Sequence, residues 1–274
     1  MLDLNRATLK SKAKETLKAS YWNAFLVAFI ISMVTGGIST IVSLPSSMST
    51  IFTSGSYNSF YDIGYDFGMG HDFGMGSSLA VAGIILIAVL VAVVIGIVFA
   101  LAFQAFVVGP LTVGANKFFI NSTYKKDEVG TISFAFSNGY MNVVKGSFLA
   151  VLYPTLWALV PFAGVFISIY KSYSYAMVPY LLADNPAMPP KRALELSTQI
   201  MHGRRMNYFV LSLSFMGWAL LSLFTFGIGA FFLSPYIYAT NAQFYMAVST
   251  DAINRGITNR AELNLPEPVA PAMQ

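Results

Sequence analysis

Long apolar stretches that carry almost no charge constrain this chain more than any other feature. Such stretches occupy residues 22–44, 79–108 and 206–249, and a helix that spans a bilayer needs about 20 mostly apolar residues. Of the 16 Lys and Arg residues, all but Lys171 can be assigned to one side of a membrane. Because cytoplasmic segments carry an excess of Lys and Arg, this asymmetry predicts a polytopic membrane protein.

The composition supports the same class of protein. Hydrophobic residues make up 56% of the chain and charged residues only 10%, whereas soluble domains carry about 25% charged residues. The positive-inside distribution accounts for the net charge of +4, so we expect no nucleic-acid partner. The chain has no cysteine, which excludes disulfides, thiolate metal sites and cysteine nucleophiles.

Charge and turn signals together predict an all-α membrane domain of residues 1–262 with both termini in the cytoplasm. Pro161 and Gly164 divide the apolar region 143–184 into two arms, so the spans form three helical hairpins. The exterior loop is placed at 45–78, which contains no Lys or Arg. Residues 263–274 are proline-rich and are expected to form a disordered cytoplasmic tail. The six predicted spans are 22–44, 79–108, 143–160, 162–184, 206–226 and 230–249.

Each hairpin is preceded by a segment whose pattern predicts an amphipathic cytoplasmic surface helix, at 9–19, 132–144 and 190–202. Anionic lipid headgroups are the expected partners of their basic residues. Each inward span also has a proline followed six residues later by an asparagine. The pattern fits either an internal duplication or features common to membrane helices. The pairs are Pro110 and Asn116, Pro179 and Asn185, and Pro235 and Asn241.

Lys171 is the candidate functional residue. It lies nine residues from the exterior end of its predicted span, about 14 Å deep at 1.5 Å per residue. No Asp or Glu lies inside the predicted spans, since Asp184 and Asp251 are at cytoplasmic ends. Three states stay open: a neutral lysine, a lysine held by carbonyls and tyrosine hydroxyls, or a charged lysine that holds an anion such as a lipid phosphate. An interfacial lysine is the structural alternative.

Polar and aromatic residues near Lys171 predict a ligand site inside the bundle, although hydrogen bonding between helices without any ligand explains them equally well. The predicted ligand-binding residues are Lys171, Tyr175, Ser168, Tyr153, Tyr236 and Asn241.

Neither a metal site nor a cofactor is predicted. The exterior loop contains a tandem repeat of residues 65–70 and 71–76. Its Asp66, His71 and Asp72 are few ligands for calcium, so a flexible loop is the better interpretation. The other histidine, His202, is expected on the opposite side of the membrane. With no metalloprotease, nucleophile-elbow or phosphate-loop pattern, we expect no enzymatic activity.

The C-terminal hundred residues resemble a known family. The similar segments are 174–186, 193–197 with 201–203 and 213–218, and finally 235–236, 239–240 and 244–245. They resemble the bacterial integral membrane family called domain of unknown function 975. The resemblance implies a multi-pass protein of the bacterial plasma membrane with no established activity, and it carries over no catalytic residue.

Two functional hypotheses follow. The first is a non-enzymatic protein that binds or moves an amphiphilic or anionic ligand, such as a membrane lipid, near Lys171. The alternative is a structural or accessory protein that recruits partners through its basic cytoplasmic helices.

Overall fold

The computed structural model describes residues 5–54, 75–124, 128–158, 160–161, 163–225 and 228–265. Within these ranges the chain forms helices and turns without any strand, which confirms the all-α prediction. The chain divides into two compact units. The larger contains Met1–Met33 and Gln104–Gln274, and the smaller contains Val34–Phe103.

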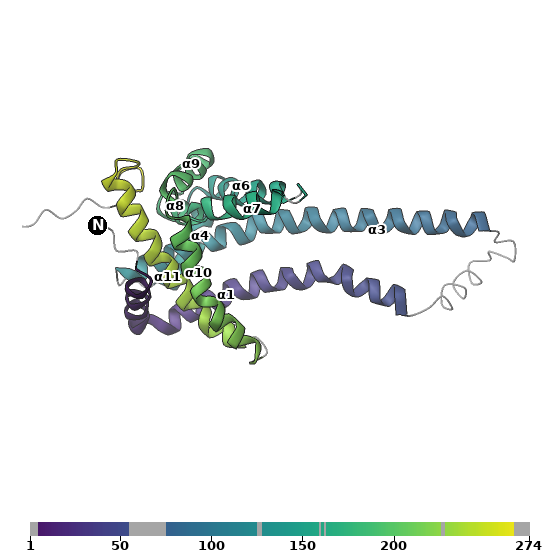
Figure 1. Ribbon diagram of the computed structural model, residues 1–274, viewed down its shortest axis with the longest axis horizontal. Coiled ribbons are helices and arrows are strands. Elements are labelled where there is room, and N and C mark those ends of the chain that lie inside the picture. The colour runs from purple at the N-terminus through teal and green to yellow at the C-terminus, as the bar shows by residue number, and fades with distance from the viewer. Residues whose placement is uncertain are drawn as a thin grey trace, which may run out of the picture. The chain divides into compact units, whose positions relative to one another are not determined.

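Helices cover all six predicted spans, but the fourth is divided. A turn at residues 175–177 separates its two helices, α7 and α8. The elements, most of them labelled in Figure 1, are α1 (Arg6–Ser54), α3 (Met75–Phe103), the π-helix η1 (Gln104–Val108), α4 (Gly109–Thr123), the 3₁₀-helix η2 (Val129–Ser133), α5 (Phe134–Ser137), α6 (Tyr140–Ala158), α7 (Ala163–Ser174), α8 (Val178–Asp184), α9 (Pro190–Ile200), α10 (Arg205–Leu223) and α11 (Ile228–Asn254).

One continuous helical stretch among the described residues, Leu86–Thr123, is long and apolar enough to cross a membrane. A second candidate consists of Arg6–Lys18 and Ser20–Thr35, which meet at a bend of 104°. The structure thus supports a membrane-spanning helix, whereas six spans in three hairpins are not confirmed.

The segment 45–78, predicted as an exterior loop, contains helix at both ends. Helix α1 continues through Pro45 to Ser54, and α3 already begins at Met75. A proline removes one hydrogen bond from a helix and often bends it, but here the residues after it stay helical. Most of the tandem repeat, including Asp66, His71 and Asp72, lies outside the described residues.

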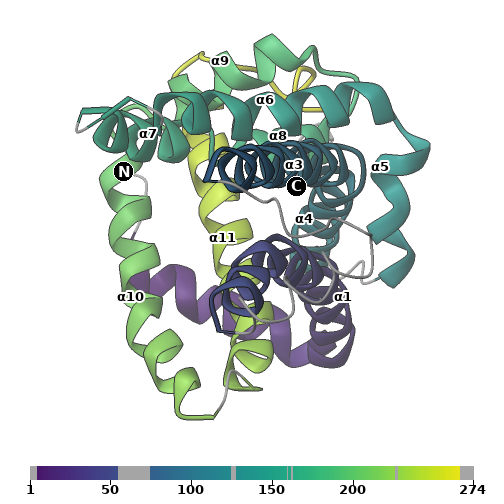
Figure 2. The same ribbon diagram turned by 90° about the vertical axis from the view of Figure 1, so that its right-hand side faces the viewer.

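The first surface helix forms as predicted, but the protein itself covers its apolar stripe. Leu9, Ala13 and Leu17 are each at most 7% exposed. At Ser20 the backbone leaves helical geometry, with φ −143° and ψ 36°, and the chain bends there. Figure 2 shows the segment before this bend running across α10 and α11.

The other two predicted surface helices have different outcomes. Helix α9 forms where 190–202 was predicted, and it buries Leu194, Leu196 and Ile200. The segment 132–144 is not one helix, because η2, α5 and the start of α6 divide it. Gly139 lies in this break with a φ of +60°, a conformation that glycine adopts without steric cost.

The core of the larger unit lies where α4, α8, α9 and α11 pack together. Its fully buried side chains are large and apolar, and they include Phe118, Phe119, Leu181, Leu182, Leu196 and Phe244. The backbone approach is close at Gly114, where an added Cβ would overlap the carbonyl group of Ile132.

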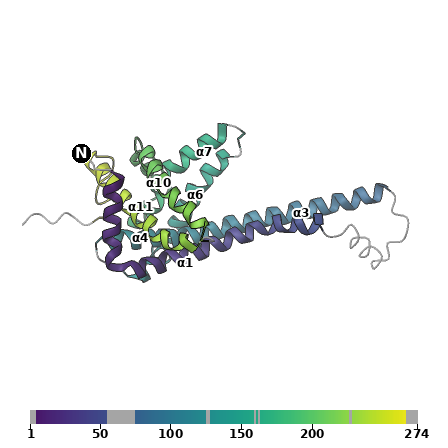
Figure 3. The ribbon, with the colours of Figure 1, turned by 60° about the horizontal axis from the view of Figure 1, so that its bottom comes forward.

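Helices α6 and α7 form one hairpin, and α10 and α11 form the other. Figure 3 shows α6 and α7 side by side. We call residues 155–166 and 216–232 the hairpin tips. Most described side chains in the tips are exposed. The exposed large apolar residues there are Leu156, Trp157, Val160, Val165, Phe166, Met216, Trp218, Leu220, Leu221, Phe224, Ile228 and Phe232.

The three Pro and Asn pairs lie in three different environments. Pro110 has no N–H, and the Phe106 carbonyl four residues earlier instead accepts a hydrogen bond of 2.9 Å from the Tyr140 hydroxyl. Before Pro235, the Phe231 carbonyl accepts one from the Ser234 hydroxyl. The asparagines also differ. Asn116 is buried, and its Oδ1 has no hydrogen-bond partner among the described residues. The Asn185 side chain donates a hydrogen bond to the Glu262 carbonyl, and Asn241 is half-buried.

Candidate functional site

A buried ion pair joins three helices at the centre of the larger unit. Asp184 ends α8 and is only 3% exposed. Its Oδ1 lies 3.4 Å from Lys117 Nζ on α4, and its Oδ2 accepts a hydrogen bond of 2.7 Å from the Tyr245 hydroxyl on α11. The Tyr180 ring stacks on Tyr245 at 5.2 Å. We call Lys117, Asp184 and Tyr245 the ion-pair core, and its satisfied carboxylate indicates a structural role.

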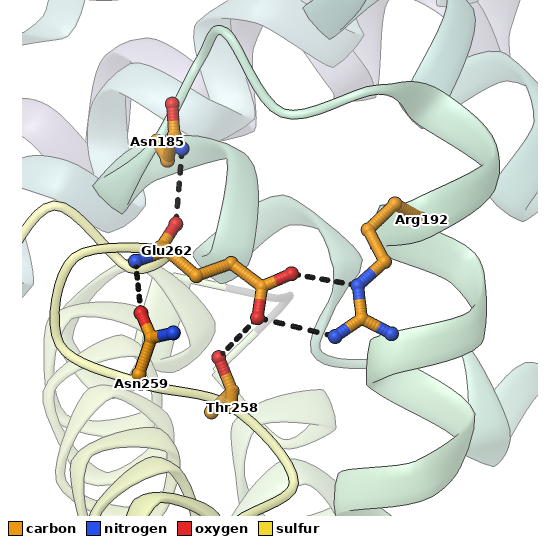
Figure 4. A network of polar contacts seen from close by, with 5 residues as sticks. All are labelled: Asn185, Arg192, Thr258, Asn259 and Glu262. Carbon is orange, nitrogen blue, oxygen red and sulfur yellow. Dashed lines mark hydrogen bonds and ion pairs between the residues drawn. The ribbon is translucent and has the colours of Figure 1, made fainter.

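A second polar network fixes the segment after α11 (Figure 4). Gly256, at a φ of +70°, ends the helix, and the chain turns back so that Glu262 faces α9. Both carboxylate oxygens accept hydrogen bonds from Arg192, at 2.6 and 3.1 Å, and one also accepts from Thr258 at 2.7 Å. A groove of about 650 Å³ lies beside this network. Leu263 is fully buried, one residue past the expected boundary of the domain.

The hydrogen bonds from Arg192 determine how Glu262 titrates. They lower the pKa of the Glu262 carboxyl more than its partial burial raises it. The same hydrogen bonds raise the pKa of the Arg192 guanidinium. Both groups therefore carry full charge at neutral pH, and the pair closes the segment onto α9.

Lys171 lies in the last turn of α7, where a cation is favoured by the helix dipole. Its side chain is half-buried. Its ammonium lies 5.8 Å from the centre of the Tyr175 ring, and the Tyr153 ring of α6 lies 6.2 Å from that of Tyr175. No carboxylate among the described residues lies within ion-pair distance of Lys171. We call Lys171, Tyr175 and Tyr153 the lysine cluster.

The other predicted ligand residues are not joined to this cluster by any ring contact or side-chain hydrogen bond between described residues. Ser168 is half-buried one turn before Lys171, and its carbonyl accepts a hydrogen bond from Ser172. Tyr236 packs edge to face on Phe215 at 5.6 Å. Asn241 is half-buried further along α11. The structure therefore brings together three of the six predicted residues.

Next to Lys171 in sequence, Tyr170 connects α7 to the beginning of α10. Arg205 Nη1 donates a hydrogen bond of 2.6 Å to the Tyr170 hydroxyl, and the guanidinium lies 4.3 Å from the centre of that ring. Arg205 Nε is buried and has no hydrogen-bond partner among the described residues. The end of α7 therefore lies beside the first residue of α10.

Two cations of α1 contact the other hairpin in a similar way. Lys10 Nζ lies 4.4 Å from the centre of the Phe215 ring and 3.4 Å from the Ser214 carbonyl oxygen. Lys14 Nζ lies 5.9 Å from the centre of the Tyr236 ring. We call Lys10, Lys14, Lys171 and Arg205 the hairpin-base cations, and none has an ion pair among the described residues.

Sequence reasoning missed the ion-pair core and the Tyr170–Arg205 contact. The predicted fourth span ends at Asp184 and Lys117 follows the predicted second span, but these positions alone did not show that the two side chains meet. A partial signal existed, since Lys117 and Asp184 flank the asparagines of two Pro and Asn pairs. The described residues contain no group of metal-ligating side chains.

The comparisons with known proteins give one match. A model of the family described as Protein of unknown function (DUF975) matches residues 77–252, which include the lysine cluster and the ion-pair core. No curated protein and no solved structure matches the chain.

Proposed function

This chain belongs to the DUF975 family, whose function is unknown, and from that premise we propose that it is a non-enzymatic integral membrane protein that binds an anionic amphiphile, such as a membrane lipid, at the lysine cluster. The observation that carries the proposal is Lys171 itself. It is half-buried against an aromatic ring and has no carboxylate partner among the described residues. A lipid phosphate supplies the missing negative charge.

The surroundings of the cluster suit an amphiphile better than a small hydrophilic anion. Val165, Phe166 and Ile169 on α7 are 52%, 78% and 49% exposed, and Tyr153 is 40% exposed. Helix α7, which carries Lys171, therefore presents apolar side chains that acyl chains can cover. Exposed apolar patches of this kind mark membrane or partner surfaces.

We place the protein in the bacterial plasma membrane with both termini in the cytoplasm. Helix α3 supports a position in a membrane, because its described side chains from Leu86 to Leu101 are mostly apolar and exposed, and the one-sided Lys and Arg residues favour cytoplasmic termini. A hairpin returns the chain to the side of the membrane where it began. Both termini therefore lie on the same side, whether each hairpin crosses the whole membrane or only part of it. Single cysteines at Ser11, Ser56 and Thr258 test this, and we expect an impermeant reagent to label only Ser56→Cys from outside.

Lipid retention tests the ligand. We expect Lys171→Met and Lys171→Ala to lose phospholipid that co-purifies with the wild type, as counted by native mass spectrometry. Lys145→Met is the matched control, because Lys145 is an exposed lysine of α6. Equal retention in all four proteins, together with an unchanged phenotype in a deletion strain that expresses the variants, contradicts the proposal.

The exposed basic face of α1 favours the alternative function, recruitment of a partner protein. Lys12 and Lys18 are exposed, whereas Lys10 contacts Phe215. Charge reversal at Lys12 and Lys18 therefore tests recruitment without disturbing packing. If it abolishes the capture of partners from membranes while Lys171→Met has no effect, the alternative is correct.

A further inference from the structure

We infer that the α6–α7 and α10–α11 hairpins are half-depth membrane anchors, whose apolar tips enter only the cytoplasmic leaflet while the hairpin-base cations contact anionic headgroups. The occupant of this surface is a lipid leaflet that contains anionic lipid. The inference goes beyond the proposed function, because it holds whether or not one lipid stays bound at Lys171.

The contacts of α1 indicate how deep the α10–α11 hairpin lies in the membrane. Its basic first segment meets α10 at Ser214 and Phe215 and meets α11 at Tyr236. A segment with several cations belongs at the headgroup level, since charge in the hydrocarbon is costly. From Phe215 to the end of α10 at Leu223 the helix measures about 12 Å, less than half of the roughly 30 Å hydrocarbon thickness.

The α6–α7 hairpin gives the same depth from independent contacts. Arg205 binds the Tyr170 hydroxyl, and Lys171 follows directly. From Tyr170 back to Ala163, where α7 begins, the helix measures about 10 Å. If these two cations lie among the headgroups, the turn of this hairpin also ends near the middle of the bilayer.

The tips have the composition that a leaflet interior requires. Neither 155–166 nor 216–232 contains a charged residue. Phe224 is 85% exposed, Phe166 78% and Trp218 58%, so the protein does not cover them. Water would face a large apolar surface here, whereas acyl chains solvate it.

The charges at the bases complement the same partner. Lys10, Lys14, Lys171 and Arg205 all lie on aromatic rings at the base of a tip. The ion pairs found among the described residues all lie elsewhere, at Asp184, Asp251 and Glu262. A basic zone below an apolar tip matches an anionic surface above an acyl layer.

Single cysteines in this cysteine-free chain test the depth. Val160→Cys and Phe224→Cys place a thiol at each tip, with Ser56→Cys as the exterior control and Ser11→Cys as the interior control. We expect an impermeant maleimide to label neither tip, in intact or permeabilised cells, above the level of the cysteine-free chain. Labelling of a tip from outside shows a complete crossing, and labelling only after permeabilisation shows a tip in the cytoplasm. Either result overturns the inference.

A second measurement tests whether the protein itself, rather than the lipid, shields the tips from the maleimide. A nitroxide attached at each tip in proteoliposomes should be accessible to oxygen and inaccessible to a water-soluble nickel chelate, which is the signature of the bilayer interior. A tip inaccessible to both reagents lies inside protein and contradicts the inference. If Phe224→Cys does not yield folded protein, Ile228→Cys replaces it, since Ile228 is 60% exposed. Lipid counting at Lys171 can fail while this result stands, so the two proposals are tested separately.

Discussion

Lys117 and Lys171 are both lysines of the larger unit, but their surroundings differ. Lys117 faces a carboxylate that is 3% exposed and shares it with a buried tyrosine. Lys171 faces the Tyr175 ring and has no carboxylate partner among the described residues. A carboxylate inside the protein must be compensated by the protein, whereas a cation at a membrane surface can be compensated by a headgroup. The same substitution at both lysines therefore tests the difference.

We expect the largest loss of stability from Lys117→Met. The change leaves Asp184 buried without its cation, and removing one partner of a buried pair costs about 3–5 kcal/mol. Thermal unfolding of the purified protein in detergent measures the loss as a lower Tm.

The double variant Lys117→Met with Asp184→Leu is the control. It removes both charges, so it should recover most of the lost stability. Glu195→Gln changes an exposed carboxylate on α9 and should have little effect. If Lys117→Met alone unfolds like the wild type, the ion-pair core does not stabilise the fold.

The next largest effect is expected where the backbone is most tightly packed. An added Cβ at Gly114 overlaps the Ile132 carbonyl group, whereas one at Gly217 in the α10 part of the hairpin tip meets nothing within 4 Å. We expect Gly114→Ala to cost about 1–3 kcal/mol through overpacking. Gly217→Ala should be neutral or raise stability by up to about 1 kcal/mol, because alanine favours helix. Equal Tm values for the two variants would remove this distinction.

A smaller, pH-dependent effect is expected at the segment after α11. Arg192 holds the pKa of Glu262 below its usual value, so the pair contributes stability above the unfolded pKa of about 4.3. That stability is lost as the pH falls through the folded pKa. At pH 7 Glu262→Gln should cost about 1 kcal/mol, allowing for partial exposure. The Tm difference from wild type should shrink between pH 6 and about pH 3, and a difference that stays constant would contradict this account.

Periodicity and charge were enough to predict most helices of the larger unit. The turn near Pro161, the amphipathic pattern of α9 and the stripe of Leu9, Ala13 and Leu17 all appear in the structure. These features are local, since each depends on residues within a few turns of one another. The break of the fourth span at 175–177 was not predicted, because the apolar composition continues through it.

Only part of the site could be predicted, because some of its contacts join residues that are far apart in the sequence. Tyr175 lies four residues from Lys171, so one helix face brings them together, and the hairpin adds Tyr153. Contacts such as Arg205 with Tyr170, or Lys117 with Asp184, join residues 35 and 67 positions apart. Such contacts depend on how whole helices pack, which the pattern of one segment does not contain.

The smallest change in stability is expected from Lys171→Met, the substitution that is most costly at Lys117. No carboxylate among the described residues depends on Lys171, so its loss leaves no known buried charge unpaired, and the unfolding free energy in detergent should stay within about 0.5 kcal/mol of the wild type. Added anionic phospholipid should then raise the Tm of the wild type more than that of the variant, because binding to the folded state adds stability. Lys145→Met should respond to that lipid like the wild type. If Lys171→Met lowers the Tm as far as Lys117→Met does, the two lysines are equivalent structural cations, and the lysine cluster belongs to the protein core rather than to a lipid site.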